Sequence, residues 1–308
     1  MSRPITVGGR PWRRGQGVLP ADGAWGSELI ARGLAPGDAP EEWNLSRHAD
    51  VLGVARSYRE AGSVVVETNS FGAGRRQLAR HGLAGRVQEI NRLAAEITAA
   101  AVGSEGVVAG SMGPSGELLV TGETDEAKLY ELFAEQARAL AEGGANWIAV
   151  ETMGDVAEMS VAVRAAVQAT SLPVSASMTY EPGAGGFRTM MGNEPSQCVR
   201  AAVAAGASII GANCGKGISY YPELTRTLRS LTDLPLWIYP NAGIPVVRAG
   251  TVSYPLGPQE FAARMQDVLE AGADIVGGCC GTTPAHIAAM AASLGDRSRA
   301  GSNSPDPE

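Results

Sequence analysis

The sequence has no run of apolar residues that approaches the roughly 20 needed to cross a lipid bilayer. It also lacks a basic surplus: 25 lysines and arginines stand against 32 aspartates and glutamates, and the net charge is −7. Because phosphate binding requires concentrated lysine and arginine, this balance argues against a nucleic-acid partner. Arg13-Arg14 is not followed by the apolar region of an export signal. We therefore expect a cytoplasmic protein that binds neither membranes nor nucleic acids.

Aromatic residues make up only 5% of the chain and cysteines number four, whereas glycine is frequent, with 40 residues. Four cysteines in a reducing compartment indicate metal binding or catalysis more than a disulfide framework. The many glycines suit short turns between strands and helices. With 44% hydrophobic residues, the chain has enough apolar material for a core.

Short apolar, β-branched runs recur along the chain and predict eight strands. These runs are Val18–Leu19, Val64–Val66, Val107–Ala109, Trp147–Val150, Val174–Met178, Ser208–Ile210, Leu236–Tyr239 and Ile275–Val276.

Segments with helical spacing separate these runs, and several end in a glycine just before the next run. Glycine there accepts the left-handed conformation that ends a helix. The predicted helices cover residues 49–60, 86–101, 126–142, 155–170, 196–205, 221–231, 258–271 and 284–294.

Eight alternating strands and helices predict an α/β fold, a single-domain (β/α)8 TIM barrel over residues 17–295. A doubly wound open sheet is the alternative, and the count of eight favours the barrel. Residues 1–16 form an N-terminal extension that we expect over the barrel surface. Residues 296–308 are polar and rich in serine and proline, which predicts a disordered tail.

Residues capable of chemistry follow the predicted strands, and in a barrel the carboxyl ends of the strands carry the active site. Cys279-Cys280 follows the eighth strand between glycines, and Cys214 ends the sixth. Three sulfurs that converge on one rim suit Zn²⁺, which in catalytic sites takes three protein ligands and keeps one open position. Buried core cysteines or a vicinal disulfide are the alternatives, the latter strained and disfavoured in a cytoplasm. Cys198 lies within a predicted helix and is expected in the core.

Two cysteine motifs, Gly211-Ala-Asn-Cys214 and Gly277-Gly-Cys-Cys-Gly-Thr282, resemble the zinc-ligand motifs of the homocysteine S-methyltransferase family. The likeness runs from about residue 18 to residue 294. Further similar motifs are Asp22-Gly-Ala-Trp-Gly-Ser27, Glu67-Thr-Asn-Ser-Phe71, Gly110-Ser-Met-Gly-Pro114, Pro240-Asn-Ala-Gly243 and Val252-Ser-Tyr-Pro-Leu256. The last two are most similar to the homocysteine-binding barrel of cobalamin-dependent methionine synthase, here as a stand-alone domain.

The resemblance implies a zinc-dependent S-methyltransferase that methylates the zinc-bound thiolate of homocysteine to give methionine. It assigns the substrate ammonium to Asp22 and Glu151, and the carboxylate to backbone N–H groups of the loop that starts at Gly23. Zinc would hold the thiol deprotonated, although its free pKa is about 8.5. Without the family, Asp22 is equally a turn residue, and Glu151 a partner in a strand-end salt bridge.

Several points stay open at this stage. Asn241 either occupies the open zinc position before substrate arrives or caps a turn, and Glu67 is expected to brace the rim. Trp25 and Trp43 either form a cage for a quaternary ammonium donor or simply pack.

The methyl donor is a small molecule or methylcobalamin carried by a separate corrinoid protein, since Tyr239 and the loop after Cys214 depart from the large enzyme. Two alternative functions are a corrinoid-linked methyltransferase that acts on a different thiol and a non-catalytic zinc scaffold that docks a corrinoid protein. The chain could also form a homo-oligomer.

Overall fold

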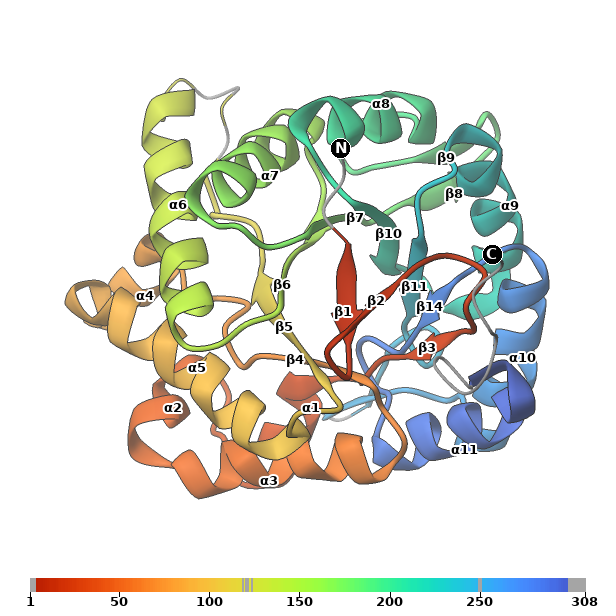
Figure 1. Cartoon of the computed structure of the whole chain (residues 1–308), viewed down its shortest axis with the longest axis horizontal. Coiled ribbons are helices and arrows are strands. Elements are labelled where there is room, and N and C mark those ends of the chain that lie inside the picture. The colour runs from red at the N-terminus through yellow and green to blue at the C-terminus, as the bar shows by residue number, and fades with distance from the viewer. Residues whose placement is uncertain (1–3, 118, 120–121, 123, 249–250, 299–308) are drawn as a thin grey trace.

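The eight predicted strands form one parallel sheet that closes into a barrel (Figure 1). The computed structural model describes residues 4–298 except 118, 120–121, 123 and 249–250. Around the barrel the strands are β3 (Leu19–Pro20), β14 (Ile275–Val276), β11 (Leu236–Pro240), β10 (Ile209–Cys214), β7 (Val174–Met178), β6 (Trp147–Met153), β5 (Val107–Met112) and β4 (Val65–Glu67).

The barrel closes between its first two strands in chain order. Ala21 forms a parallel bridge with Val65, and the Val64 N–H donates to the Pro20 carbonyl at 2.7 Å. This closure confirms the (β/α)8 prediction over an open sheet, because an open sheet would leave both edges unpaired.

All eight predicted helices are present and surround the barrel (Figure 1). Their spacing explains this placement: in the first of them Val51, Val54, Ala55 and Tyr58 are buried on one face, toward the sheet. The helices are α3 (His48–Glu60), α5 (Val87–Val102), α6 (Glu126–Glu142), α7 (Val156–Ala169), α8 (Pro195–Ala205), α9 (Tyr221–Leu231), α10 (Pro258–Glu270) and α11 (Pro284–Leu294).

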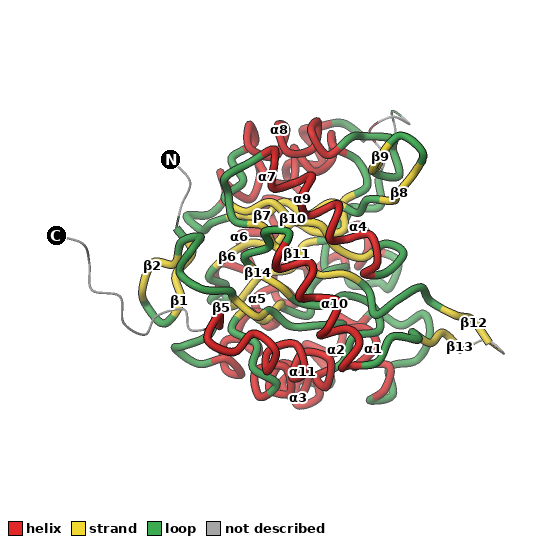
Figure 2. The backbone as a smooth tube through the Cα atoms, turned by 90° about the vertical axis from the view of Figure 1, so that its right-hand side faces the viewer, coloured by secondary structure: helices red, strands yellow, loops and turns green. Residues whose placement is uncertain are grey.

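Loops after the strands carry further short elements. Helix α1 (Trp25–Ala31) follows β3, and the 3-10 helix η1 (Pro40–Glu42), α2 (Trp43–Ser46) and α4 (Arg75–Ala79) lie nearby in sequence. Two hairpins, β8 (Glu181–Gly183) with β9 (Gly186–Arg188) and β12 (Val246–Arg248) with β13 (Thr251–Ser253), follow β7 and β11. Figure 2 shows the β12–β13 hairpin projecting from the body of the molecule.

The N-terminal extension contains an antiparallel hairpin of β1 (Ile5–Val7) and β2 (Arg10–Trp12), which the sequence did not predict. Ile5 and Trp12 are each only 4% exposed and pack against the side chains that fill the barrel interior. The extension therefore contributes to the core and does more than cover the surface.

At the other end of the chain, the predicted tail starts within the 3-10 helix η5 (Gly295–Ser298), and residues 299–308 lie outside the described residues. No helix in the described part of the chain combines the length and the hydropathy that a bilayer crossing requires.

Candidate active site

Three cysteine sulfurs meet at the carboxyl ends of the strands. Cys214 is the last residue of β10, Cys279 and Cys280 follow β14, and the three sulfur atoms lie within 4.8 Å of one another. All four cysteines lie in the described part of the chain and are free thiols, so the structure contains no vicinal disulfide. The three are partly exposed, whereas Cys198 is buried in α8 at 1% exposure, as expected for a core cysteine. This cluster could hold a metal ion.

Special backbone geometry brings the three sulfurs together. Cys214 adopts φ of 66°, a left-handed conformation that a non-glycine residue adopts only at a cost. On the other side of the cluster, the Gly278 N–H donates to the Asp22 carbonyl, and a Cβ at Gly278 would lie 2.4 Å from the Thr282 side chain. Glycine is thus required beside the cysteine pair.

Polar side chains surround the sulfurs. The Asn213 amide donates toward Cys279 Sγ at 3.9 Å, the Asn241 side chain contacts Cys214, and the Tyr254 hydroxyl is within reach of Cys280.

The three thiols differ in acidity. Hydrogen bonds from the Cys279 and Cys280 thiols lower the pKa of Cys214 to about 3, while the hydrogen bond to Cys214 raises the pKa of Cys280 to about 11. The hydrogen bonds within the cluster therefore favour the thiolate form at Cys214. A thiolate is the form of cysteine that binds metals.

Three carboxyl groups near the sulfurs are buried: Asp22 is 2% exposed, Glu67 7% and Glu151 5%. Trp25 Nε1 donates to Asp22 Oδ2, and the Ser111 hydroxyl donates to Glu151 Oε1. None of the three carboxyls forms an ion pair with another described residue. The alternative of a strand-end salt bridge at Glu151 is therefore wrong.

Burial dominates the protonation of these carboxyls, because it penalises their charged forms. It raises the pKa of Asp22 to about 7 and that of Glu151 to about 7, and it raises the pKa of Glu67 well above its usual range. A cation bound among them would offset this penalty. The three carboxyls are therefore candidates for binding a cationic group.

One cavity of about 250 Å³ is lined by the three cysteines and by Glu67 and Glu151, but not by Asp22, which contacts the lining residue Trp25. Its volume suits a small molecule, and its lining contains both thiols and carboxyls. It is lined by Gly23–Ser27, Pro40, Glu41, Glu67–Phe71, Ser111, Glu151, Thr152, Cys214 and Gly278–Cys280.

Residues 19–294 match the family model described as homocysteine S-methyltransferase. The chain belongs to the homocysteine S-methyltransferase family. This match confirms the resemblance that the cysteine motifs carried.

Relatives of this family member include the methionine synthases of Mycobacterium tuberculosis and Mycobacterium leprae. The first is 33% identical over 302 residues, which are 92% of this chain and 25% of the relative. The second is 33% identical over 299 residues, which are 91% and 24%. The chain thus spans about a quarter of the length of these curated relatives.

The fold agrees with solved structures. The homocysteine methyltransferase MmuM from Escherichia coli matches in its metallated form with a TM-score of 0.76 and 24% identity, over 90% of this chain and 96% of that chain. Its oxidized form matches with a TM-score of 0.75 over 89% and 95%. At this identity the likeness establishes the barrel fold.

In this protein the two ends of the Asn241 amide have different environments. Its Nδ2 donates to the Gly215 carbonyl at 2.6 Å, which fixes the turn after Cys214. Its Oδ1 is buried and has no hydrogen-bond partner among the described residues. The amide nitrogen therefore stabilises the turn, and Asn241 is not among the residues that line the cavity.

The two tryptophans do not form a cage. Trp25 lines the cavity, but Trp43 is 6% exposed and packs under the Arg47 guanidinium, whose carbon lies 3.9 Å from the ring centroid. Of the two readings, packing is correct for Trp43.

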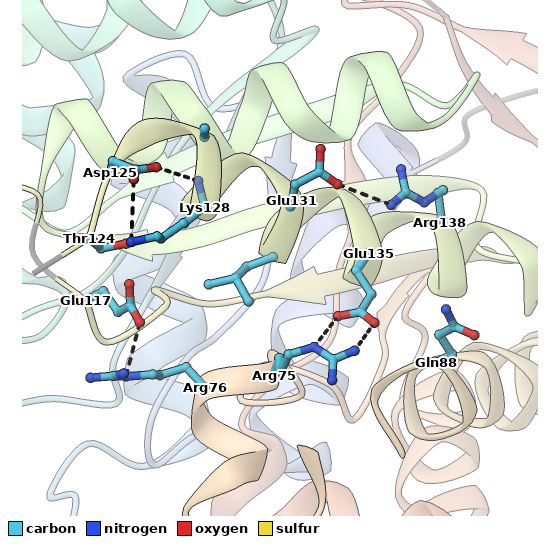
Figure 3. A pocket seen from close by; sticks show the side chains of 12 residues that line it. Arg75, Arg76, Gln88, Glu117, Thr124, Asp125, Lys128, Glu131, Glu135 and Arg138 are labelled. Atoms are coloured by element: carbon cyan, nitrogen blue, oxygen red, sulfur yellow. Dashed lines mark hydrogen bonds and ion pairs between the residues drawn. The ribbon is translucent and has the colours of Figure 1, made fainter. Parts of the chain in front are cut away.

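A larger groove of about 860 Å³ lies apart from the cysteines, between α4 and α6 (Figure 3). Its charged side chains pair with one another: Arg75 with Glu135, Arg76 with Glu117 at 3.2 Å, and Lys128 with Asp125 at 3.6 Å. Because these charges neutralise each other, the groove presents no surplus of either sign to a ligand.

Sequence reasoning did not assign a role to several residues that the structure brings to the site. Ser111 and Tyr254 each lie in a motif that carried the resemblance, and Asn213 is the neighbour of a predicted ligand. Glu67, expected as a brace of the rim, lies in the cavity beside Glu151. The sequence motifs include these residues, but which side chains they contact is known only from the fold.

Proposed function

We propose that this chain is a zinc-dependent S-methyltransferase that transfers a methyl group to the sulfur of homocysteine and forms methionine. One observation carries the proposal: a single cavity is lined both by the three convergent cysteines and by the buried carboxyls of Glu67 and Glu151, and its lining residue Trp25 donates to the buried Asp22 carboxyl. Homocysteine has a thiol at one end and an ammonium at the other, so its two ends match these two kinds of group.

The donor set fits zinc. Cys214, Cys279 and Cys280 offer three soft sulfur ligands within reach of one ion, and the cavity leaves space for a fourth. When bound, zinc would supply the Lewis acidity that keeps the substrate thiol deprotonated at neutral pH. The metallated form of the MmuM neighbour supports this part of the proposal.

The protein's own residues hold the amino-acid end. Asp22 and Glu151 bind the ammonium through charge-assisted hydrogen bonds, and Ser111 and Trp25 keep these carboxylates in place. The substrate carboxylate lies at the loop that starts at Gly23, where the N-terminus of α1 has no side-chain cap. These contacts hold the sulfur of homocysteine at the three cysteines.

Methyl transfer needs no further base. The sulfur electron pair forms the new S–C bond while the donor's bond to the same carbon breaks, and the donor leaves with that electron pair. The protein contributes position, because reacting atoms held in line convert a bimolecular step into an effectively unimolecular one.

The donor is either a small methylated molecule or methylcobalamin on a separate corrinoid protein. Exposed apolar side chains on the loops that follow β7, β11 and β4 favour a protein carrier: Met190 is 80% exposed, Ile244 58% and Phe71 44%. Loops after parallel strands lie at the end of a barrel that carries the active site, and exposed apolar side chains there suit docking. The cytoplasm, where thiols stay reduced, is the location that this chemistry requires.

The test uses purified, reduced protein loaded with zinc and supplied with homocysteine, other thiols and a panel of methyl donors. Methionine formed with a small donor alone would exclude the protein carrier, whereas turnover only after addition of a methylcorrinoid protein would support it. Turnover with another thiol alone would correct the acceptor. A protein that binds zinc, but neither binds homocysteine nor forms a methylated product, would support the alternative of a non-catalytic zinc scaffold. Metal analysis that finds no zinc would contradict the proposal.

A further inference from the structure

The side chain of Asn213 contacts Cys279 of the sulfur cluster and Thr152, the residue that follows Glu151. It is completely buried in β10, and Oδ1 accepts from the Thr152 N–H at 2.9 Å and from the Ser177 hydroxyl at 2.8 Å. Its Nδ2 donates to Thr152 Oγ1 at 2.7 Å and toward Cys279 Sγ at 3.9 Å. An amide offers two acceptor and two donor positions, so all four are used.

The contact with Thr152 compensates for an irregular backbone. Thr152 has φ of 58°, which is an outlier for a β-branched residue. It lies where the pairing of β6 with β7 shifts register, between Val150 and Met153, so the strand contains a bulge. The Asn213 amide satisfies both the N–H and the hydroxyl of Thr152 in this bulge. Bulges next to active sites redirect side chains, and the residue redirected here is Glu151.

The contact with Cys279 acts on the sulfur cluster. Asn213 precedes Cys214, whose φ of 66° is the second non-glycine outlier among the described residues. An amide N–H directed at a sulfur that binds a metal fixes the orientation of that sulfur. A single side chain thus touches one predicted zinc ligand, adjoins another, and braces the turn that carries Glu151.

We propose that Asn213 is a positioning residue. It fixes the position of the sulfur cluster relative to the Glu151 carboxyl, so that one homocysteine molecule reaches both. The inference rests on the proposed function. It assigns Asn213 two separable effects: on zinc through Cys279, and on homocysteine through the Thr152 bulge.

The first test measures zinc affinity by competition with a chromophoric chelator, and homocysteine affinity by calorimetry on zinc-loaded protein. Asn213→Ala is expected to weaken both by about 10-fold or more, the range usual for partners of metal ligands. Asn91→Ala is the matched control. Asn91 is also completely buried and braces backbone carbonyls of Ala73 and Val87, far from the sulfurs. It is expected to lower the melting temperature and leave both affinities unchanged.

The double variant Asn213→Ala with Thr152→Gly separates the two effects. Glycine accepts positive φ without strain, so the bulge no longer needs the amide. Homocysteine affinity should recover while zinc affinity stays low. Should Asn213→Ala not fold, Asn213→Asp replaces it: this variant keeps the acceptor for the Thr152 N–H, loses the donor to Cys279, and is expected to lose zinc affinity selectively.

Two results would overturn the inference: wild-type affinities in Asn213→Ala, or recovery of both affinities in the double variant. A wild-type protein that binds neither zinc nor homocysteine would instead overturn the proposed function, so the two failures are distinguishable.

Discussion

Trp25 Nε1 donates a 2.9 Å hydrogen bond to Asp22 Oδ2, and the same oxygen accepts the Glu67 N–H at 2.9 Å. The indole and the backbone of β4 thus hold the carboxylate in one orientation. The ring also forms part of the cavity wall. Trp25 therefore contributes to the proposed substrate site in two ways: it donates a hydrogen bond to Asp22, and its side chain lines the cavity.

Trp25→Phe is expected to weaken homocysteine binding by about 10-fold, because a hydrogen bond to a charged group is lost while most of the ring remains. The measurement is calorimetric titration of zinc-loaded protein. Trp43→Phe serves as the control, since Trp43 packs under Arg47 and does not line the cavity. Equal losses in both variants would contradict a specific role of the Trp25–Asp22 contact.

The stability of the metal-free protein is expected to depend on pH through Asp22. Burial raises its pKa from 3.8 to about 7, so the folded state holds a proton that the unfolded chain has already released. The stability from this group is fully present below about pH 4 and is lost as the pH rises through about 7. The melting temperature of the wild-type protein relative to that of Asp22→Asn should fall between pH 5 and pH 8, because this difference isolates the Asp22 contribution.

Asp22→Asn serves as the reference because its amide does not ionise. At pH 8 the variant should melt higher than wild type without substrate, yet homocysteine should stabilise only the wild-type protein. The check is a pair of thermal scans with and without homocysteine. A variant as sensitive to pH as wild type would assign the effect to other groups.

Cys280→Ala is expected to lose zinc while the barrel stays folded, because Cys280 is not part of the hydrophobic core. Metal analysis and circular dichroism on the same sample give the two readouts. Cys198→Ala, a change in the core of α8, should retain zinc. Unfolding of Cys280→Ala alone would mean that the metal is structural, and the proposed chemistry would fail.

Glu67 and Glu151 are expected to respond differently to the same substitution. Burial raises the pKa of Glu67, and its contact with Glu151 raises the pKa of Glu67 further while it lowers that of Glu151, so the contact favours Glu67 as the donor. A glutamine amide can donate as well, and Glu67→Gln should therefore keep homocysteine affinity near wild type. Glu151→Gln removes the charge that binds the ammonium and should weaken binding by about 10-fold or more. The measurement is calorimetric titration of each variant with homocysteine. A larger loss of affinity in Glu67→Gln than in Glu151→Gln would mean that Glu67 is the carboxylate that binds the ammonium.

The sequence was most informative about the barrel. Eight apolar runs and eight helical segments correspond to the observed strands and helices within a few residues, because burial against a common sheet imposes periodicity that is visible locally. The positions of Cys214, Cys279 and Cys280 at strand ends followed from the same pattern.

The sequence did not predict the β1–β2 hairpin. Its strands have three residues each, too short for an alternating pattern, and their burial depends on the barrel interior that Ile5 and Trp12 contact. Likewise, the bulge at Thr152 has no local signal, because threonine ordinarily avoids positive φ.

The sequence by itself therefore determined which residue types stand at the carboxyl ends of the strands, since hydrophobic periodicity and turn glycines are written locally along the chain. Only the tertiary structure decided which of these residues touch: that Asn213 reaches Thr152 and Cys279, and that Glu67 lies against Glu151. Such contacts join residues 61 to 84 positions apart. They exist because barrel closure brings separate strand ends to one rim, which no local pattern encodes.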